Sequence, residues 1–416
     1  MRRTAVIGSG IAGMAAAYFL SRKQEIHLFE KESRLGGHTN TVVIENSLGR
    51  LAIDTGFIVH NDRTYPNLVR LFRELGVETQ ASDMSFAVAC RKTGFEYSSR
   101  GLNGFFAQKQ NFFRSRHYEL LWEILRFNRE APKLLLAPEA PEMTLGEYLD
   151  EHHFSANFTD RYLYPMASAV WSTSRAAIRS FPALTLIRFF DNHGMLQITN
   201  QPKWRVVRGG SHQYIAPLTA SYRDRIHLGA NITGVTRDER GVTLRFADRP
   251  AMRFDDVVFA CHGDQVLPLL ESSSDAEREI LGTFRTTRNE TWLHTDARLL
   301  PARPQARASW NYNLEAEGSP GASVTYHMNR LQSLDLPEDY CVTLNPGGQI
   351  DESKVLRKIT YHHPLYDRAA LRAQARWAEI SGRNHTHYCG AYWIYGFHED
   401  GLTSALRVAR SLGVSW

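Results

Sequence analysis

Short apolar runs, separated by glycine or polar turns, mark the elements expected at the start of the chain. Residues 4–7 and 25–29 have the pattern of buried strands, and residues 14–22 have that of a helix. Parallel strands need a crossover connection, so these three segments form one βαβ unit. Residues 50–58 add an extended segment, and residues 65–75 add a helix.

The rest of the chain alternates between two kinds of pattern. Residues 61–200 are rich in aromatic residues and look mostly helical, without another glycine-rich turn between strand and helix. Strand patterns return at 226–260 and 323–344, and a last strand is expected at 388–393 before a closing helix at 402–412. We therefore expect two discontinuous domains, the first made of residues 1–60, 201–265 and 375–416, and the second of residues 61–200 and 266–374.

Length and composition are those of an ordinary globular enzyme. The chain has 416 residues, of which 43% are apolar and 22% are charged, enough for two lobes with real hydrophobic cores. Its four cysteines form no CxxC pair, which argues against a disulfide framework and a cysteine zinc site. No signal-peptide pattern follows Met1 and no run of 18 apolar residues occurs, so we expect a cytoplasmic protein that is soluble or peripheral to a membrane.

A glycine-rich turn between the first expected strand and helix carries the first chemical signal. Gly8, Gly10 and Gly13 form a GxGxxG pattern. The first glycine permits a tight turn, the second lets a pyrophosphate approach the backbone, and the third lets the helix pack on the strand. Glu30 ends the next strand, where a carboxylate can accept hydrogen bonds from a ribose diol. These features predict a dinucleotide site, but NAD and FAD share them.

The segment that begins at Glu30 distinguishes the two cofactors. Residues 30–39 read EKESRLGGHT, which resembles the ExxxRxGG extension of FAD proteins of the glutathione-reductase-like class. The resemblance is to the branch that contains flavin-containing amine oxidases, phytoene desaturases and protoporphyrinogen oxidases. It implies an α/β fold in which a Rossmann-like FAD-binding domain is joined to a discontinuous α+β substrate domain. Arg34 would lie beside the adenosine, and the paired glycines Gly36 and Gly37 along the pyrophosphate.

Further segments resemble the same branch. Residues 54–59 match its D-x-G strand under the isoalloxazine, and residues 231–235 with Ala260 match the strands that flank the adenine. Residues 388–402 match its closing motif, in which an acid and a glycine open a helix whose positive end faces the flavin. The residues that these motifs assign to FAD are Gly8, Ser9, Gly10, Ile11, Ala12, Gly13, Glu30, Lys31, Arg34, Leu35, Gly36, Gly37, His38, Thr39, Gly56, Phe57, Ile58, Val59, Asn231, Ile232, Ala260, Gly390, His398, Glu399, Asp400, Gly401 and Leu402.

Segments outside these motifs resemble a bacterial subfamily of the branch. Residues 325–332, 342–346, 363–367 and 393–402 carry this likeness. Members of the subfamily are described as NAD/FAD-binding or amine-oxidase-like proteins, and some are linked with modification of membrane fatty acids, including desaturation of methylated acyl chains. The resemblance implies a desaturase-like oxidoreductase that takes a hydride from an apolar substrate, such as a lipid acyl chain.

Three alternatives stay open. The branch also contains amine oxidases, although no counterpart of their flavin-facing lysine is identified here. A flavin-dependent fatty-acid isomerase needs no external electron acceptor, and a non-catalytic flavin-binding partner of a lipid enzyme would show no turnover. No metal-ligand pattern, P-loop or GxSxG frame is present, so the chemistry has to come from the flavin. His60, Tyr326, Tyr392 and Trp393 are the candidates to border the flavin and the substrate.

The segment 91–133 combines positive charge with aromatic residues. It holds nine basic residues against four acidic ones, an excess equal to the net charge of +5 of the whole chain. Its residues at helical spacing are Tyr118, Leu121, Trp122 and Leu125. This stripe either packs inside the second domain or meets a membrane, with arginines on anionic headgroups. No nucleic-acid-binding module is present, so the expected partner is an apolar or lipid substrate, and the oligomeric state stays open.

Overall fold

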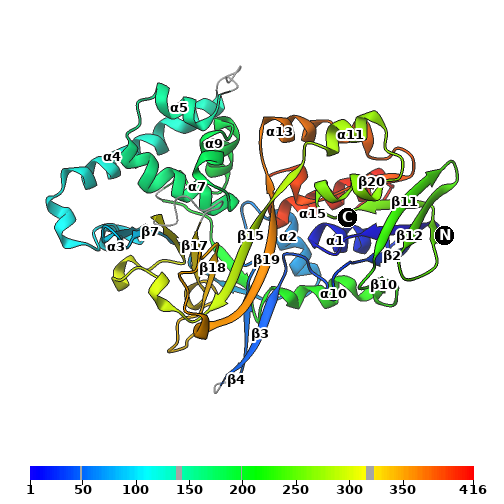
Figure 1. Ribbon diagram of the computed structural model, residues 1–416, viewed down its shortest axis with the longest axis horizontal. Coiled ribbons are helices and arrows are strands. Elements are labelled where there is room, and N and C mark those ends of the chain that lie inside the picture. The colour runs from blue at the N-terminus through cyan, green and yellow to red at the C-terminus, as the bar shows by residue number, and fades with distance from the viewer. Residues whose placement is uncertain (47–48, 137–142, 198, 315–322) are drawn as a thin grey trace.

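The protein has two lobes, each with its own hydrophobic core (Figure 1). The computed structural model describes residues 1–46, 49–136, 143–197, 199–314 and 323–416. Both chain termini lie in the lobe on the right of Figure 1, which also contains the first strand and helix. Within the described ranges, no helix combines the length and apolar character needed to cross a membrane.

A five-stranded parallel sheet forms the centre of the first lobe. Its order is β10-β2-β1-β14-β20, so the N-terminal strand lies in the middle. Parallel strands are buried on both faces, which explains their nearly continuous apolar sequences. This is the α/β arrangement expected from the sequence. The strands are β1 (Arg3–Ile7), β2 (Glu25–Phe29), β10 (Ile226–His227), β14 (Asp256–Phe259) and β20 (Thr386–Tyr388).

Helices and one small sheet complete the first lobe. Helix α1 packs against α15 and α10, and α2 also packs against α15. Helices α2, α11 and α13 were expected in the second domain, but their fully buried apolar side chains belong to the first core. There α2 packs against α15, and α11 packs against α13 and α14. The elements are α1 (Ile11–Leu20), α2 (Pro66–Glu74), α10 (Ile215–Thr219), α11 (Asp275–Leu281), α13 (Arg368–Ala375), α14 (Trp377–Ile380), α15 (His398–Ser411) and the antiparallel strands β11 (Ile232–Asp238), β12 (Gly241–Phe246) and β13 (Met252–Phe254).

The second lobe combines a seven-stranded sheet with a layer of helices. The sheet order is β19-β15-β18-β17-β16-β7-β8, and all neighbours are antiparallel except β7 and β16. The strands are β7 (Phe86–Cys90), β8 (Phe95–Ser98), β15 (Arg285–His294), β16 (Trp310–Asn313), β17 (Val324–His327), β18 (Cys341–Leu344) and β19 (Val355–Leu365). The helices are α3 (Gly101–Phe105), α4 (Ser115–Glu130), α5 (Leu145–Glu151), α6 (Ala156–Phe158), α7 (Tyr164–Trp171), α8 (Arg175–Arg179), α9 (Ala183–Asn192) and α12 (Met328–Leu331).

Two further small sheets are formed by strands that lie close to the second core. Strand β3 (Thr41–Asn46) pairs with β4 (Gly49–Asp54), and β9 (Trp204–Val207) lies between β5 (Val59–Asn61) and β6 (Thr79–Ala81). Neighbouring residues of a strand point to opposite faces, so Val206 packs in the second core and Val207 in the first. The sheet that contains β9 is therefore a wall shared by both cores.

Two expected elements near the C-terminus have different bounds. Strand β20 ends at Tyr388 rather than at residue 393, because Gly390, with φ of +153°, turns the chain into a 3-10 turn at Ala391–Trp393. The closing helix begins at His398 instead of residue 402. Its start is fixed by Asp400, whose carboxylate accepts the backbone N–H of Phe397 at 2.8 Å.

Candidate functional site: a cavity between the lobes

The glycine turn between β1 and α1 has different surroundings at each of its three glycines. A Cβ at Gly8 would lie 2.8 Å from the carbonyl oxygen of Ala260, and a Cβ at Gly13 would lie 1.9 Å from the carbonyl oxygen of Gly8. At Gly10 nothing lies within 4 Å of a Cβ, and the residue lines a large cavity. The outer glycines permit close packing, whereas Gly10 keeps open the space that a pyrophosphate needs at the N-terminus of α1.

Glu30 holds the glycine turn from the end of β2. Its Oε2 accepts hydrogen bonds from the backbone nitrogen of Ser9 at 2.9 Å and from Ser9 Oγ at 2.6 Å. Its Oε1 accepts one from the backbone nitrogen of Glu32 at 2.9 Å. The carboxylate is buried in the protein and borders the same cavity as Gly10. The acid at this position therefore shapes the turn as well as the nucleotide end of the cavity.

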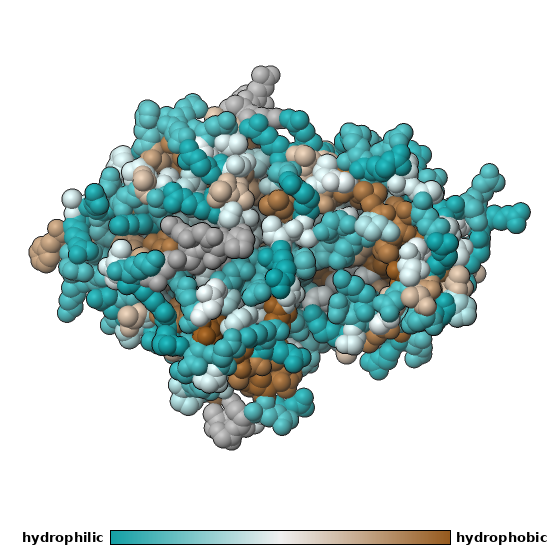
Figure 2. All heavy atoms as spheres, viewed as in Figure 1, coloured by the Kyte–Doolittle hydropathy of each residue, from teal (hydrophilic) through white to brown (hydrophobic). Residues whose placement is uncertain are grey.

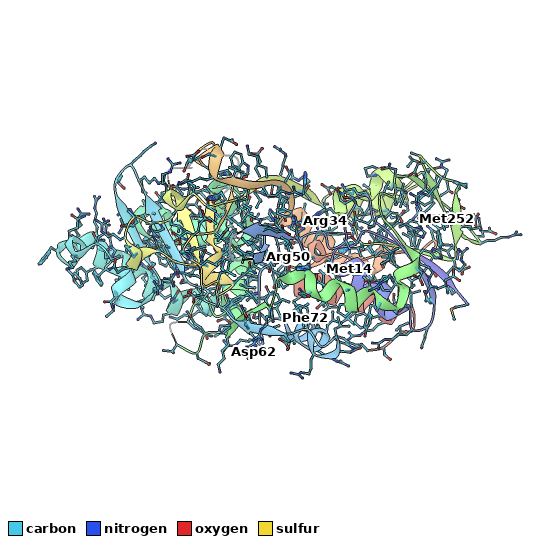
Figure 3. All side chains as sticks on the ribbon, turned by 90° about the horizontal axis from the view of Figure 1, so that it is seen from below. Met14, Arg34, Arg50, Asp62, Phe72 and Met252 are labelled. Atoms are coloured by element: carbon cyan, nitrogen blue, oxygen red, sulfur yellow. The ribbon has the colours of Figure 1, made fainter. Side chains whose placement is uncertain are left out.

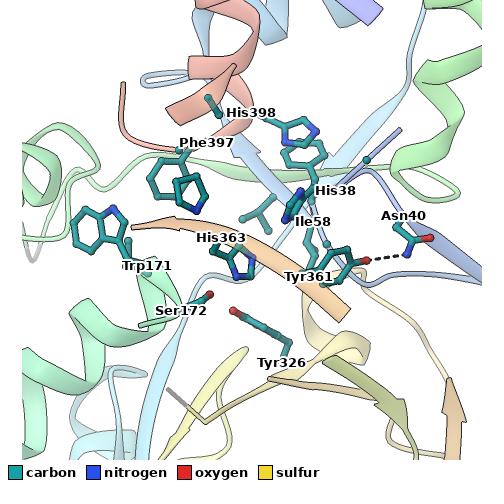
Figure 4. Close-up of a pocket in the computed structure, with 18 of the residues that line it drawn as sticks. His38, Asn40, Ile58, Trp171, Ser172, Tyr326, Tyr361, His363, Phe397 and His398 are labelled. Carbon is teal, nitrogen blue, oxygen red and sulfur yellow. Dashed lines mark hydrogen bonds between the residues drawn. The ribbon is translucent and has the colours of Figure 1, made fainter. Parts of the chain in front are cut away.

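The turn opens into a cavity of 2340 Å³ that is lined by residues of both lobes. Figure 4 shows side chains from α7, β17, β19 and the start of α15 around an open space in this cavity. Seen from below, Arg34 lies where the two lobes meet (Figure 3). A small-molecule pocket usually measures roughly 300–1,000 Å³. This cavity is large enough for a dinucleotide and a second ligand together.

Histidine and tyrosine rings gather in the middle of the cavity. The rings of His38 and Tyr361 stack with centroids 5.0 Å apart, and that of His363 lies 5.2 Å from His38. The ring of His398 stacks on Phe57 at 3.6 Å. Burial lowers the pKa of His363 to about 4 and that of His398 to about 3. At neutral pH the middle of the cavity therefore presents uncharged rings.

Two asparagines fix the tautomer of His363. Asn345 Nδ2 donates a hydrogen bond to Asn289 Oδ1 at 2.8 Å, and Asn289 Nδ2 donates one to His363 Nδ1 at 2.9 Å. Because Nδ1 accepts this bond, the neutral ring carries its proton on Nε2. His363 is thus a hydrogen-bond donor held in one orientation.

The N-terminus of α15 reaches the cavity beside that of α1. His398 and the preceding Phe397 line the cavity. A Cβ at Gly401 would lie 2.8 Å from Ile11 Cγ2, so glycine allows α15 to approach α1 closely. Both helices direct the positive ends of their dipoles toward one cavity. A phosphate, or a ring that gains negative charge, is stabilised at such a place.

The sequence pattern over most of the chain agrees with this geometry. The model of the family described as flavin containing amine oxidoreductase matches residues 11–320. The chain belongs to this family. Its cofactor is FAD. The open space at Gly10, where a Cβ would meet nothing within 4 Å, fits the pyrophosphate. When bound, FAD supplies an acceptor for a hydride, which carries two electrons and a proton.

Solved flavoenzyme structures share the architecture over nearly the whole chain. Putrescine oxidase bound to putrescine has 13% sequence identity and a TM-score of 0.70, covering 99% of this chain and 98% of that one. A CLA-producing fatty acid isomerase from P. acnes has 14% identity and a TM-score of 0.71, covering 99% of each chain. A putative protoporphyrinogen oxidase from Exiguobacterium sp. 255-15 has 17% identity and a TM-score of 0.67, covering 99% of this chain and 98% of that one. These likenesses confirm the expected fold, a Rossmann-like FAD-binding domain with a substrate domain. No curated protein sequence matches the chain.

Many of the residues that sequence motifs assigned to FAD border the cavity of this flavoprotein. They are Gly8, Ser9, Gly10, Ile11, Ala12, Glu30, Lys31, Arg34, Gly37, His38, Gly56, Phe57, Ile58, Val59, Ile232, Ala260, Gly390 and His398. The others lie outside its lining and are Gly13, Leu35, Gly36, Thr39, Asn231, Glu399, Asp400, Gly401 and Leu402. Glu399, for example, faces α2, where its carboxylate accepts the backbone N–H groups of Asn67 and Leu68 at 3.0 and 2.9 Å.

The four pocket candidates divide equally. Tyr326 and Tyr392 line the cavity. His60 and Trp393 do not line it, because each is buried against a neighbouring ring of the protein. The ring centroid of His60 lies 5.2 Å from that of Phe72, and that of Trp393 lies 4.8 Å from that of Phe284.

Sequence reasoning missed Tyr361, His363 and Trp171, which also surround the cavity (Figure 4). His363 entered the sequence analysis only as the first residue of the segment 363–367, without a role in the cavity. Alternate residues of a strand share a face, so Tyr361 and His363 on β19 point to the same side. An aromatic residue and a histidine at this spacing were the available signal. Trp171 offered no comparable signal, because its position depends on how α7 packs against the sheet.

The pH dependence of folding should change when Asp400 is replaced by asparagine. Burial, with a smaller contribution from Glu399, raises the pKa of Asp400 from 3.8 to about 7. The protonated acid is thus favoured in the folded state, so its contribution to the free energy of unfolding is complete below pH 3.8 and is lost as the pH rises through 7. We expect wild type to lose about 3 kcal/mol between pH 5 and 8 from this group, and Asp400→Asn to lose much less.

Urea unfolding at several pH values measures this difference. In wild type, the Asp400 carboxylate accepts the backbone N–H groups of Phe397 and Tyr395, and the side-chain oxygen of an asparagine can accept them as well. Asp224→Asn, at an exposed position, is the matched control, and its free energy of unfolding should fall with pH as steeply as that of wild type. Equal slopes for wild type and Asp400→Asn would contradict the assignment.

Proposed function

We propose that this flavoprotein oxidises an apolar acyl chain by taking a hydride from a C–H bond held in the cavity, as a desaturase does. The supporting observation is the part of the cavity lining that residues 84–204 provide. Among the described residues 84–204, none that lines the cavity is an Asp, Glu, Lys or Arg. Its apolar members include Leu102, Phe105, Leu121, Ile124, Met166 and Val170.

This lining favours an acyl chain over an amine. Each methylene that leaves water contributes about 0.8 kcal/mol. A protonated amine, by contrast, would be buried in this part of the cavity without a counter-ion, which is costly. The lysines that line the cavity are Lys31, next to Glu30, and Lys358, which pairs with Glu352 at 2.8 Å. Neither belongs to the group of rings around His38.

The residues of the chain have two tasks in such a reaction. The apolar wall excludes water and orients the acyl chain, so that one C–H bond is held beside the flavin. Desaturation removes a hydride from one carbon and a proton from its neighbour. The Nε2 of His38 has no hydrogen-bond partner within the protein, so the proton can pass to this nitrogen. Burial lowers the pKa of His38, which keeps the ring neutral before the reaction and makes it a weak base. His363, with its proton on Nε2, can donate a hydrogen bond to a polar atom of the substrate.

Anaerobic mixing tests the proposal. The FAD-loaded protein is mixed with extracted membrane lipids or their fatty acids, and in parallel with primary amines and polyamines. We expect the flavin absorbance near about 450 nm to bleach with the lipids and to persist with the amines. Bleaching by amines alone would overturn the proposal in favour of an amine oxidase.

A redox-neutral isomerase is the second candidate, because a fatty acid isomerase shares the fold over 99% of both chains. It would use the same apolar cavity but return the hydride to the substrate. Chromatography of the lipid products without any electron acceptor separates the two functions. A rearranged double bond with no lasting loss of absorbance indicates isomerisation, and a newly formed double bond with a bleached flavin indicates desaturation.

A further inference from the structure

Helix α4 exposes an apolar stripe to solvent. On this stripe, Tyr118, Trp122 and Leu125 are 46%, 59% and 41% exposed, and Phe113, which precedes the helix, is 93% exposed. The helix uses its opposite face for the core, through Leu120, Glu123 and Phe127, which are buried. Leu121, the fourth residue of the stripe, is partly buried against the second core. Because the other three residues are exposed, the stripe as a whole is not packed inside the second lobe, which was one of the two interpretations that its spacing allowed.

In the segment 91–133, most acidic side chains are buried or half-buried, whereas most basic side chains are exposed. Of the four acidic residues in 91–133, Glu96 and Glu123 are buried, Glu130 is half-buried and only Glu119 is exposed. Glu96 binds Arg303, and Glu123 accepts the backbone N–H of Ser155 at 2.9 Å. Eight of the nine basic residues are exposed, namely Arg91, Lys92, Arg100, Lys109, Arg114, Arg116, Arg129 and Lys133. The surface here is more positive than the sequence count alone indicates.

The apolar stripe borders the far end of the cavity. Leu121, Ile124 and Leu125 of α4 line the cavity, as does Leu102 of α3, which is 71% exposed. Leu125 thus faces both the cavity and the solvent. In Figure 1 these helices form the end of the second lobe that is farthest from the chain termini, and Figure 2 shows an apolar side chain protruding at the same edge. A molecule that enters beside α4 meets apolar side chains from the outer surface inward.

We propose that this end of the protein rests on an anionic lipid bilayer and admits an acyl chain from it. The docking surface consists of Leu102, Phe113, Tyr118, Trp122 and Leu125, together with Arg114, Arg116 and Arg129. Aromatic side chains enter the interface between headgroups and acyl chains, and the bases meet the anionic headgroups. The entry of an acyl chain rests on the proposed function, whereas docking on the bilayer does not.

Co-sedimentation with vesicles tests the docking. The FAD-loaded protein is mixed with phosphatidylcholine vesicles, with or without phosphatidylserine, at low and high salt. Each base near an anionic surface strengthens binding by about fivefold, so three bases account for about 100-fold. We expect wild type to sediment with the anionic vesicles at low salt and to be released by high salt. Arg114→Glu, Arg116→Glu and Arg129→Glu in one variant should weaken binding by at least about 100-fold.

Two further variants make the result specific. Phe113→Ser with Trp122→Ser should weaken binding to the anionic vesicles by about tenfold, because both apolar anchors are removed. The matched control reverses three exposed bases of the first lobe, Arg223→Glu, Arg240→Glu and Arg383→Glu, and should bind nearly as wild type does. FAD content, measured by absorbance, shows that each variant is folded.

Several outcomes would overturn the proposal. They are wild type that ignores anionic vesicles, wild type that binds neutral vesicles equally well, and equal losses in the docking variant and its control. Full binding by the serine variant would show that charge alone attracts the protein, as it would to any polyanion such as a nucleic acid. This result would also overturn the proposal. Because binding is measured without turnover, docking can fail while the proposed oxidation holds, and the reverse.

Discussion

Replacing Gly10 with valine should give a folded protein that has lost its FAD. Gly10 has φ of −64°, which valine adopts without strain, and nothing lies within 4 Å of the added Cβ. The side chain therefore projects into the cavity, where the pyrophosphate has to contact the backbone. We expect FAD to bind at least about 100-fold more weakly, which corresponds to about 3 kcal/mol. Absorbance of the purified protein and titration with FAD measure this loss.

Gly13→Val is the matched comparison within the same turn. Its Cβ would lie 1.9 Å from the carbonyl oxygen of Gly8, so α1 would have to move away from β1. This change should prevent folding rather than remove the cofactor alone. Circular dichroism separates the two variants, because Gly10→Val should keep the wild-type spectrum. Wild-type FAD content in Gly10→Val would show that the phosphates bind elsewhere.

Replacing Ile124 with tryptophan should block the apolar end of the cavity. Ile124 is half-buried on α4 and lines the cavity. The indole fills space that a long acyl chain would occupy, and misfit in an apolar pocket costs about 1–3 kcal/mol. We expect kcat/KM for long-chain substrates to fall by about 100-fold, with unchanged FAD content. Short-chain analogues that do not reach α4 should lose much less.

The control places the same side chain on another face of the same helix. Glu119 is exposed and does not line the cavity, so Glu119→Trp should keep near wild-type activity. Rates are measured as flavin bleaching with acyl chains of increasing length. If Ile124→Trp lowers the bleaching rates for long and short chains by the same factor, the substrate does not extend toward α4.

The nucleotide end of the site could be predicted from the sequence because its elements are consecutive. Strand, turn, helix and strand follow one another from Arg3 to Phe29. Local spacing therefore already places Gly10 and Glu30 near the carboxyl ends of two neighbouring parallel strands. The hydrogen bonds from Ser9 to Glu30 agree with that placement. Here each residue depends mainly on its near neighbours in the chain.

The middle of the cavity could not be predicted in the same way. His38, Tyr361 and Trp171 are far apart in sequence and line one cavity only because the folded chain brings β19 and α7 of the second lobe around it. The stripe on α4 shows a related limit. Its spacing predicted one apolar face, but the helix has a second, with Leu120 and Phe127, and it is this face that packs in the core. Periodicity alone does not decide which of two apolar faces is buried.

The wall that contains β9 couples the stability of the two lobes. Val206 packs in one core and its neighbour Val207 in the other, and Phe57 and Ile58 divide in the same manner. Neither core can open without exposing apolar side chains of a strand that the other core needs. The two lobes should therefore unfold together rather than one after the other. A fragment limited to either lobe would expose to water the apolar side chains by which β9 packs against the missing core.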